Sequence, residues 1–272
     1  MIPPESPAEI LPEPGPAVTS DFFDAGVLDS TLDGGIGARA AIGLLVLASD
    51  QTMEHEFRRL VPGDGIGLYV TRVWNDLLIT PETLRRMRDL IAPATRLLLP
   101  GMPLDVVAFG CTSATMAMGE ETIFAEIARE RPEVRCTTPI TAALAAFEAL
   151  EARRIAVLTP YGADVNAMMR TYLEGRGVTV VGFGTFDKPD DRDAARVSLD
   201  SIRAAAELLV ARSGADAVFI SCTSLRLSER VAEIEAAVGV PVTSSDHSLA
   251  WHCLRLAGIE EPIAGAGRLF TL

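Results

Sequence analysis

The chain has 272 residues, of which 49% are hydrophobic, so it can bury one large core or two cores of ordinary size. Its formal net charge of −13 argues against a nucleic-acid partner, because the phosphates would be repelled. No apolar run approaches the roughly 18 residues of a membrane span, and residues 1–20 lack an apolar signal segment, so we expect a cytoplasmic protein without a membrane partner.

Residues 1–39 differ in composition from the rest of the chain. Six prolines occur among the first sixteen residues, and seven acidic residues precede the first basic one, Arg39. Such a composition cannot bury enough apolar surface to fold alone, which predicts a disordered N-terminal tail. The alternative is a tail that packs across a neighbouring subunit, for which four apolar side chains are candidate anchors: Phe22, Phe23, Val27 and Leu28.

From Ala40 onwards, short apolar runs alternate with longer amphipathic or apolar segments, which predicts strands and helices in alternation. Thr80 followed by Pro81 is typical of a helix start. In the first part of the chain we predict strands at 41–48, 66–73, 105–110 and 134–138, and helices at 53–60, 80–91, 120–131 and 140–151. In the second part we predict strands at 154–159, 178–183, 217–221 and 240–243, and helices at 161–176, 199–212, 228–238 and 249–257.

The chain contains two pairs of similar segments. Residues 105–116 read DVVAFGCTSATM and residues 216–227 read DAVFISCTSLRL, so each is an apolar strand that ends in Cys-Thr-Ser. A second pair of segments, 134–150 and 240–256, is also similar in pattern. Repeats this long indicate two copies of one unit.

The duplicated alternation predicts an α/β fold with two pseudo-symmetric Rossmann-like, or flavodoxin-like, halves. Each half is expected to be a parallel sheet flanked by helices, with the active site in the cleft between the halves. We assign residues 40–138 plus 246–272 to the first half and residues 139–245 to the second.

Cys111 and Cys222 are the candidate functional residues, because both follow a strand at equivalent positions of the two copies. Thr and Ser after each cysteine are good N-cap residues, so we expect a helix to start there. Two facing thiols can act as base and acid in a proton transfer, or one thiolate of lowered pKa can add to an activated double bond. The hydroxyls and backbone N–H groups beside them would bind a carboxylate.

Other motifs offer no metal or cofactor site. The three histidines, His55, His247 and His252, show no metal-ligand spacing with the cysteines. No glycine-rich phosphate loop follows a predicted strand, so we expect no nucleotide cofactor. Cys136 and Cys253 lack the repeated phrase, and we expect them to pack in the core.

The phrases GCTSAT and SCTSLR, in a duplicated α/β chain, resemble the aspartate/glutamate racemase superfamily. The segments LTPYGADVN (158–166) and PDDRDAARV (189–197) are similar to those of the branch that holds maleate cis-trans isomerase and arylmalonate decarboxylase. The phrases FRRLVPGDGIGLYVTRV and LAWHCLRLAGIEEPIAGAGRL further resemble the ectoine-utilisation proteins of that branch. The resemblance runs from Ala40 to the C-terminus.

This resemblance implies a cofactor-independent isomerase or racemase of a small carboxylate, maleate-like or derived from an amino acid, in a homo-oligomer of two or four chains. It implies Cys111 as nucleophile or base and Cys222 as acid. It also implies four substrate-binding residues: Thr112, Ser113, Tyr161 and Thr223. The alternatives are a decarboxylase that uses Cys222 alone, as arylmalonate decarboxylases keep only the second cysteine, and a non-catalytic protein that binds a carboxylate.

Asp50 departs from the pattern of maleate isomerases, which have a substrate-binding asparagine where this chain has aspartate. A carboxylate there would repel a second substrate carboxylate and would suit an ammonium or amide N–H. Alternatively, Asp50 caps the helix that starts near Thr52. The charged segment 187–193 (DKPDDRD) is interpreted as a solvated turn, with a rim of the cleft as the alternative.

Overall fold

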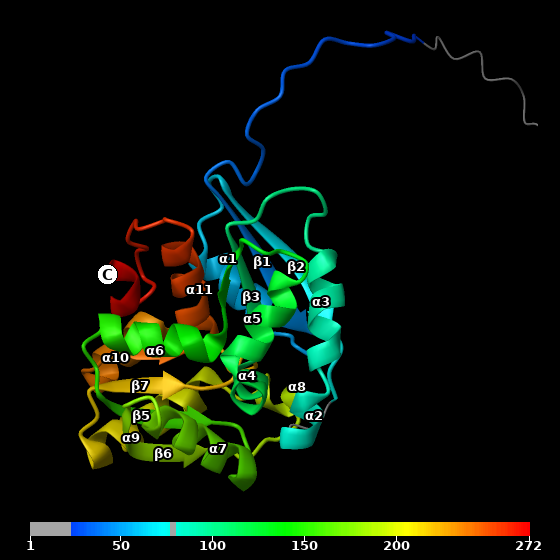
Figure 1. Ribbon diagram of the computed structural model, residues 1–272. Coiled ribbons are helices and arrows are strands. Elements are labelled where there is room, and N and C mark those ends of the chain that lie inside the picture. The colour runs from blue at the N-terminus through cyan, green and yellow to red at the C-terminus, as the bar shows by residue number, and fades with distance from the viewer. Residues whose placement is uncertain (1–22, 77–79) are drawn as a thin grey trace, which may run out of the picture. The chain divides into compact units, whose positions relative to one another are not determined.

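The computed structural model describes residues 23–76 and 80–272, in which strands and helices alternate through two successive rounds (Figure 1). Residues 34–272 form one unit, and residues 1–33 are separate from it. The prolines of the predicted tail and Phe22 lie outside the described residues, whereas Phe23, Val27 and Leu28 are exposed. The packing of this segment on a neighbouring subunit therefore stays a prediction.

The first round builds a parallel sheet with the strand order β2-β1-β3-β4. Its strands are β1 (Ala40–Leu47), β2 (Ile66–Val73), β3 (Val106–Gly110) and β4 (Arg135–Thr137). Its helices are α1 (Met53–Leu60), α2 (Pro81–Arg85), α3 (Arg88–Arg96), α4 (Thr112–Met118) and α5 (Glu120–Ala128). The two central strands, β1 and β3, consist almost wholly of buried apolar residues, as expected for a sheet that helices cover on both faces.

The second round repeats this plan with the strand order β6-β5-β7-β8, again all parallel. Its strands are β5 (Arg154–Thr159), β6 (Thr179–Thr185), β7 (Ala217–Ile220) and β8 (Val242–Ser244). Its helices are α6 (Pro139–Ala149), α7 (Ala163–Glu174), α8 (Asp191–Ala194), α9 (Leu199–Ser213), α10 (Val231–Val238) and α11 (Ser245–Leu256), followed by the 3₁₀ helix η1 (Arg268–Thr271). The equal strand order of the two sheets confirms the predicted pair of pseudo-symmetric α/β halves.

Helix α6 joins the cores of the two halves, and Figure 1 shows it between the two sheets. Ile140 and Phe147 pack in the core of the second sheet, whereas Ala142 and Ala146 pack in that of the first, beside α11. Phe147 meets Phe219 of β7 edge to face, with ring centroids 5.5 Å apart. Each such buried aromatic ring contributes about 1.5–3 kcal/mol through loss of contact with water.

The predicted helix over 80–91 is wrong in one respect, because the chain forms two helices there. Thr80 and Thr83 make the expected capping box at the start of α2. The helix then breaks, and the N–H of Met87 bonds the carbonyl of Leu84 three residues back. Leu84 and Met87 are both buried at this turn, and α3 runs on to Arg96.

A second correction concerns the helices that were expected to start at both cysteine phrases. Helix α4 begins directly after Cys111, but no helix follows Cys222, and α10 starts only at Val231. The reason lies in contacts with α1, described below. No helix in the described part of the chain is long and apolar enough to cross a membrane.

Candidate active site

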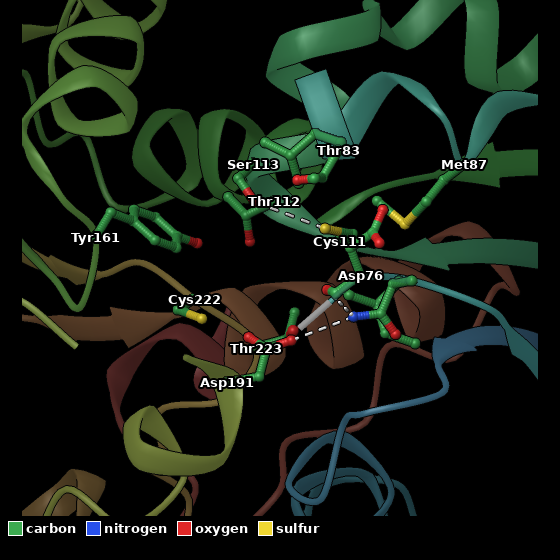
Figure 2. Close-up of a pocket in the computed structure, with 13 residues that line it drawn as sticks. Asp76, Thr83, Met87, Cys111, Thr112, Ser113, Tyr161, Asp191, Cys222 and Thr223 are labelled. Carbon is green, nitrogen blue, oxygen red and sulfur yellow. Dashed lines mark hydrogen bonds between the residues drawn. The ribbon is translucent and has the colours of Figure 1, made fainter. Parts of the chain in front are cut away.

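A cavity lies at the carboxyl ends of the strands of both sheets, where ligands bind in parallel α/β folds (Figure 2). The space in it that a water-sized sphere can occupy is only about 20 Å³, so the cavity as it stands is narrow. Both cysteines of the repeated phrases line it. The lining residues are Leu47, Asn75, Asp76, Thr83, Leu84, Met87, Cys111, Thr112, Ser113, Tyr161, Asp191, Cys222 and Thr223.

Cys111 stands at the junction of β3 and α4. Its backbone is extended, and it occupies the N-cap position itself, with no side-chain capping bond. Thr112 and Ser113 are therefore inside the first turn of the helix and do not cap it, which corrects the expected role of these hydroxyls. The Ser113 hydroxyl lies 3.7 Å from the Cys111 sulfur, and the Thr115 hydroxyl donates to the Cys111 carbonyl at 2.7 Å.

Cys222 has a backbone φ of 151°, a conformation that side chains rarely adopt. Strained backbone of this kind costs about 1–3 kcal/mol and is found at functional sites where the surroundings impose it. The N–H of Ser224 donates to the Cys222 sulfur at 3.4 Å. The chain then turns instead of entering a helix, so the second thiol is presented by a loop.

That loop is held by Glu56, a fully buried residue of α1 in the other half. Its carboxylate accepts hydrogen bonds from the N–H groups of Leu227 and Ser228, at 3.0 and 2.8 Å, and from the Ser228 hydroxyl at 2.8 Å. The Thr52 hydroxyl also donates to the Ser224 carbonyl at 3.2 Å. These contacts satisfy polar groups that a helix would have satisfied internally.

Ser245, the first residue of α11, connects the two cysteine phrases. Its hydroxyl accepts a hydrogen bond from the N–H of Cys222 at 3.0 Å and shares one of 2.7 Å with the Thr112 hydroxyl. All three residues are buried. The relative position of the two phrases is thus fixed by one side chain from outside both of them.

Tyr161 follows the end of β5 and lies to one side of the two cysteines, with its hydroxyl pointing into the cavity (Figure 2). The side chain is 1% exposed, and its hydroxyl lies close enough to Cys222 for the two groups to interact electrostatically. Its carbonyl accepts from the Asn166 amide and the Thr185 hydroxyl, both at 2.7 Å. Tyr161 is therefore not an ordinary surface tyrosine, which a tyrosine after a strand could also have been.

Asp50 is not among the residues that line the cavity, although Thr112, Ser113 and Thr223 are. One of its carboxylate oxygens, Oδ1, accepts from the N–H groups of Thr52 and Met53, each at 2.8 Å. These two bonds match the helix-capping alternative, whereas the other oxygen, Oδ2, is buried without a hydrogen-bond partner among the described residues, so a substrate contact of Asp50 stays a prediction. Burial raises the pKa of Asp50 to about 6, even though those two hydrogen bonds favour the charged form.

Burial disfavours the thiolate form of both cysteines. Burial raises the pKa of Cys111 to about 12. Burial also raises the pKa of Cys222, and the nearby Asp191 carboxylate raises it further. Each cysteine is only 4% exposed, and the described residues that line the cavity include no Lys, Arg or His, so both pKa shifts run opposite to the lowered pKa that was expected from the sequence.

Sequence reasoning missed several polar residues that line the cavity: Asn75, Asp76, Thr83 and Asp191. Asp191 belongs to the charged 187–193 segment, for which a rim of the cleft was the weaker interpretation. It is 4% exposed and opens the short helix α8. Two of these residues could have been found from the sequence, since Asn75 and Asp76 come shortly after the end of β2.

The remaining cysteines and histidines do not reach the cavity. Cys253 is fully buried in α11, as predicted, whereas Cys136 on β4 is only partly buried. His247 and His252 are held by hydroxyl partners, Thr243 and Thr137. Over residues 23–76 and 80–272, no three His, Cys, Asp or Glu side chains are placed to hold a metal ion.

The chain is similar to known proteins over most of its length. The model of the arylmalonate decarboxylase family matches residues 89–270. Maleate isomerase of Nocardia farcinica is 28% identical over 242 residues, covering 84% of this chain and 94% of that protein. Arylmalonate decarboxylase of Bordetella bronchiseptica is 32% identical over 144 residues, covering 52% of this chain and 60% of that protein.

Solved structures share the fold. A cysteine-to-serine mutant of the Nocardia farcinica maleate cis-trans isomerase, with a covalently bound succinylcysteine intermediate, has a TM-score of 0.76 to this chain. Its sequence is 24% identical, and the match covers 85% of this chain and 98% of that one. In that mutant, a cysteine other than the replaced one carries the succinyl group.

Proposed function

The chain belongs to the arylmalonate decarboxylase family, and from this premise we propose that it is a cofactor-independent isomerase or racemase of a small carboxylate. Cys111 and Cys222 are the proposed catalytic pair, and Thr112, Ser113, Tyr161 and Thr223 are the proposed substrate-binding residues. The observation that carries the proposal is that both thiols line one small cavity together with these hydroxyl groups.

The proposed binding mode follows from the donors in the cavity. Hydroxyl groups of Thr112, Ser113 and Tyr161 reach it from the first and second halves. Such donors can bind a carboxylate oxygen and stabilise the additional negative charge that develops when a carbon next to it becomes a carbanion. The substrate carbon would then lie between the two sulfurs.

Two reactions are compatible with this arrangement. In isomerisation, the Cys111 thiol first loses its proton to water, and the resulting thiolate adds to one alkene carbon while the other alkene carbon takes a proton from the Cys222 thiol. Rotation about the new single bond, return of the proton to Cys222 and loss of the Cys111 sulfur then give the other geometric isomer. The succinylcysteine adduct of the Nocardia farcinica maleate cis-trans isomerase supports this route.

In racemisation, one thiolate removes the proton beside the carboxylate, and the other thiol donates a proton to the opposite face. This route needs no covalent adduct, but it requires the same pair of sulfurs on the two sides of one carbon. The ectoine-utilisation resemblance of the sequence favours a substrate derived from an amino acid, for which racemisation is the simpler outcome. That connection stays a prediction.

A substrate screen in deuterated water tests the proposal. The full chain would be incubated with maleate, aspartate, phenylmalonate and 2,4-diaminobutyrate, and the products followed by NMR and chiral chromatography. We expect a change of alkene geometry or of configuration, with deuterium incorporated at the reacting carbon in racemisation. Release of carbon dioxide from phenylmalonate as the sole reaction would replace the proposal by a decarboxylase, and binding without turnover would replace it by a carboxylate-binding protein.

A further inference from the structure

The charges around the cavity do not match an unsubstituted dicarboxylate. The described residues that line it include two carboxylates, Asp76 and Asp191, and no Lys, Arg or His. A substrate with two carboxylates would bring two negative charges into a buried space that already contains a carboxylate of the protein. At an effective dielectric constant of about 20, two like charges 4 Å apart repel by about 4 kcal/mol.

Asp191 is the carboxylate that the substrate must meet, because it is buried beside Cys222 while Asp76 is exposed and lies 3.9 Å from Arg86. The Ser49 hydroxyl donates to one oxygen of Asp191 at 2.7 Å, and the Ser224 hydroxyl donates to the other at 3.2 Å. The described part of the chain gives Asp191 no ion pair within 4 Å.

The hydrogen bonds of Asp191 leave room for a ligand. An ionised carboxylate can accept about four hydrogen bonds, and the strong donors to Asp191 are two hydroxyls, with the Asn75 amide farther away at 3.5 Å. The hydroxyls come from opposite halves of the fold and fix the carboxylate in place. A buried, oriented carboxylate with free lone pairs and no protein cation is suited to a ligand ammonium group.

We infer that Asp191 recognises a protonated amino group of the substrate, so that the substrates are amino-substituted carboxylates rather than plain dicarboxylates. The inference rests on the proposed function, because it places this amino group beside the carboxylate that the cavity hydroxyls bind. Because Asp191 lies next to the thiols, this contact also changes the acidity of a thiol. A bound ammonium offsets the Asp191 charge and thereby makes the Cys222 thiol a stronger acid only when the substrate is present.

Asp50 does not share this role. Its Oδ1 is engaged by the N–H groups of Thr52 and Met53, and it does not line the cavity. Asp191, which the chain brings to the cavity from the other half, is therefore the carboxylate to which we assign amino-group recognition.

Calorimetric titration of the full chain with matched ligands tests the inference. The probes are both enantiomers of aspartate against succinate, and both enantiomers of 2,4-diaminobutyrate against butyrate, so that each pair differs in its amino groups alone. We expect at least one amino compound to bind at least ~10-fold more tightly than its partner, equivalent to about 1.4 kcal/mol. Asp191→Asn should abolish this ratio, whereas Asp193→Asn, an exposed neighbour in α8, should retain it.

The outcomes separate the two proposals. If the wild-type chain binds succinate or butyrate as tightly as the amino compounds, or if Asp191→Asn keeps the ratio, the inference is overturned while the proposed carboxylate enzyme survives. If the wild-type chain binds none of these probes, both fail. If Asp191→Asn does not fold, the ratio of the wild-type affinities for an amino compound and for its partner without amino groups decides whether the inference holds.

Discussion

The first cysteine phrase continues directly into helix α4, whereas the second continues into a loop that runs from Thr223 to Arg230. The two phrases share Cys-Thr-Ser and an apolar strand before it, so their local propensities are alike. They differ in what packs against them. The Glu56 carboxylate of α1 accepts hydrogen bonds from backbone N–H groups of the second phrase. The backbone after Cys111 instead forms its hydrogen bonds within α4.

This difference makes the two thiols chemically unequal. Cys111 sits on relaxed, extended backbone, and Cys222 sits at φ 151° beside Asp191 and Tyr161. A duplicated fold thus supplies two cysteines at equivalent places, and contacts from other segments give them distinct surroundings. Distinct surroundings are what a nucleophile or base and a proton donor need, since their pKa values must differ.

The largest effect should come from removing either thiol. We expect Cys111→Ser and Cys222→Ser each to lower kcat by at least ~10²-fold with little change in Tm, because two groups that act as a unit fail together. Cys136→Ser and Cys253→Ser are the matched controls outside the cavity and should keep nearly full turnover. Full activity in Cys111→Ser with loss in Cys222→Ser would mean that the second phrase works alone, as in a decarboxylase.

The second prediction concerns Glu56, whose carboxylate holds the loop after Cys222 but does not contact the helix after Cys111. Glu56→Ala leaves two N–H groups and the Ser228 hydroxyl without their acceptor, and we expect the free energy of unfolding to fall by about 3 kcal/mol. Glu54→Ala removes a partly exposed carboxylate of the same helix, paired with Arg58 and Arg72, and should cost less than about 1 kcal/mol. Urea unfolding of the three proteins measures both.

The activity of the Glu56 variants tests whether Glu56 positions the loop that carries Cys222. If Glu56 positions the loop, Glu56→Gln should recover part of the stability and of kcat, because its amide oxygen can accept one of the three bonds. Equal losses in Glu54→Ala and Glu56→Ala would show that the loop conformation does not depend on this carboxylate.

The smallest effect is expected for Asp50, which caps α1 and so supports Glu56 indirectly. Since burial raises the pKa of Asp50 to about 6, the folded state takes up a proton as the pH falls through that value, while the unfolded state does so only at lower pH. This group therefore adds about 1 kcal/mol of stability on going from about pH 7 to about pH 5. Asp50→Asn should lack that gain.

The same variant tests the capping role against a pocket role. Asparagine caps a helix about as well as aspartate, so we expect an unchanged ratio of kcat/KM between a diacid and an amino acid substrate. A shift of that ratio towards diacids would return Asp50 to the substrate site. Wild-type and Asp50→Asn unfolding curves at the two pH values provide the stability comparison.

The sequence by itself determined the alternating strands, the duplication and the place of Cys111, Cys222 and Tyr161 at strand ends. These features depend on local patterns of apolar residues and on one general property of parallel sheets, that their ligand sites lie at the carboxyl ends. Any residue directly after a central strand could therefore be assigned to the site without knowing how the halves pack.

The tertiary structure alone decided the partners of those residues. Ser245 reaches Thr112 and Cys222 across more than twenty residues of sequence in each case, and Glu56 reaches Ser228 from the other half. The same holds for the protonation of the thiols, because a pKa depends on burial and on charges such as Asp191 that lie far away in the chain. No local pattern contains those distances, and for this reason a helix was expected to start at the second phrase and a cysteine of lowered pKa was expected at the site.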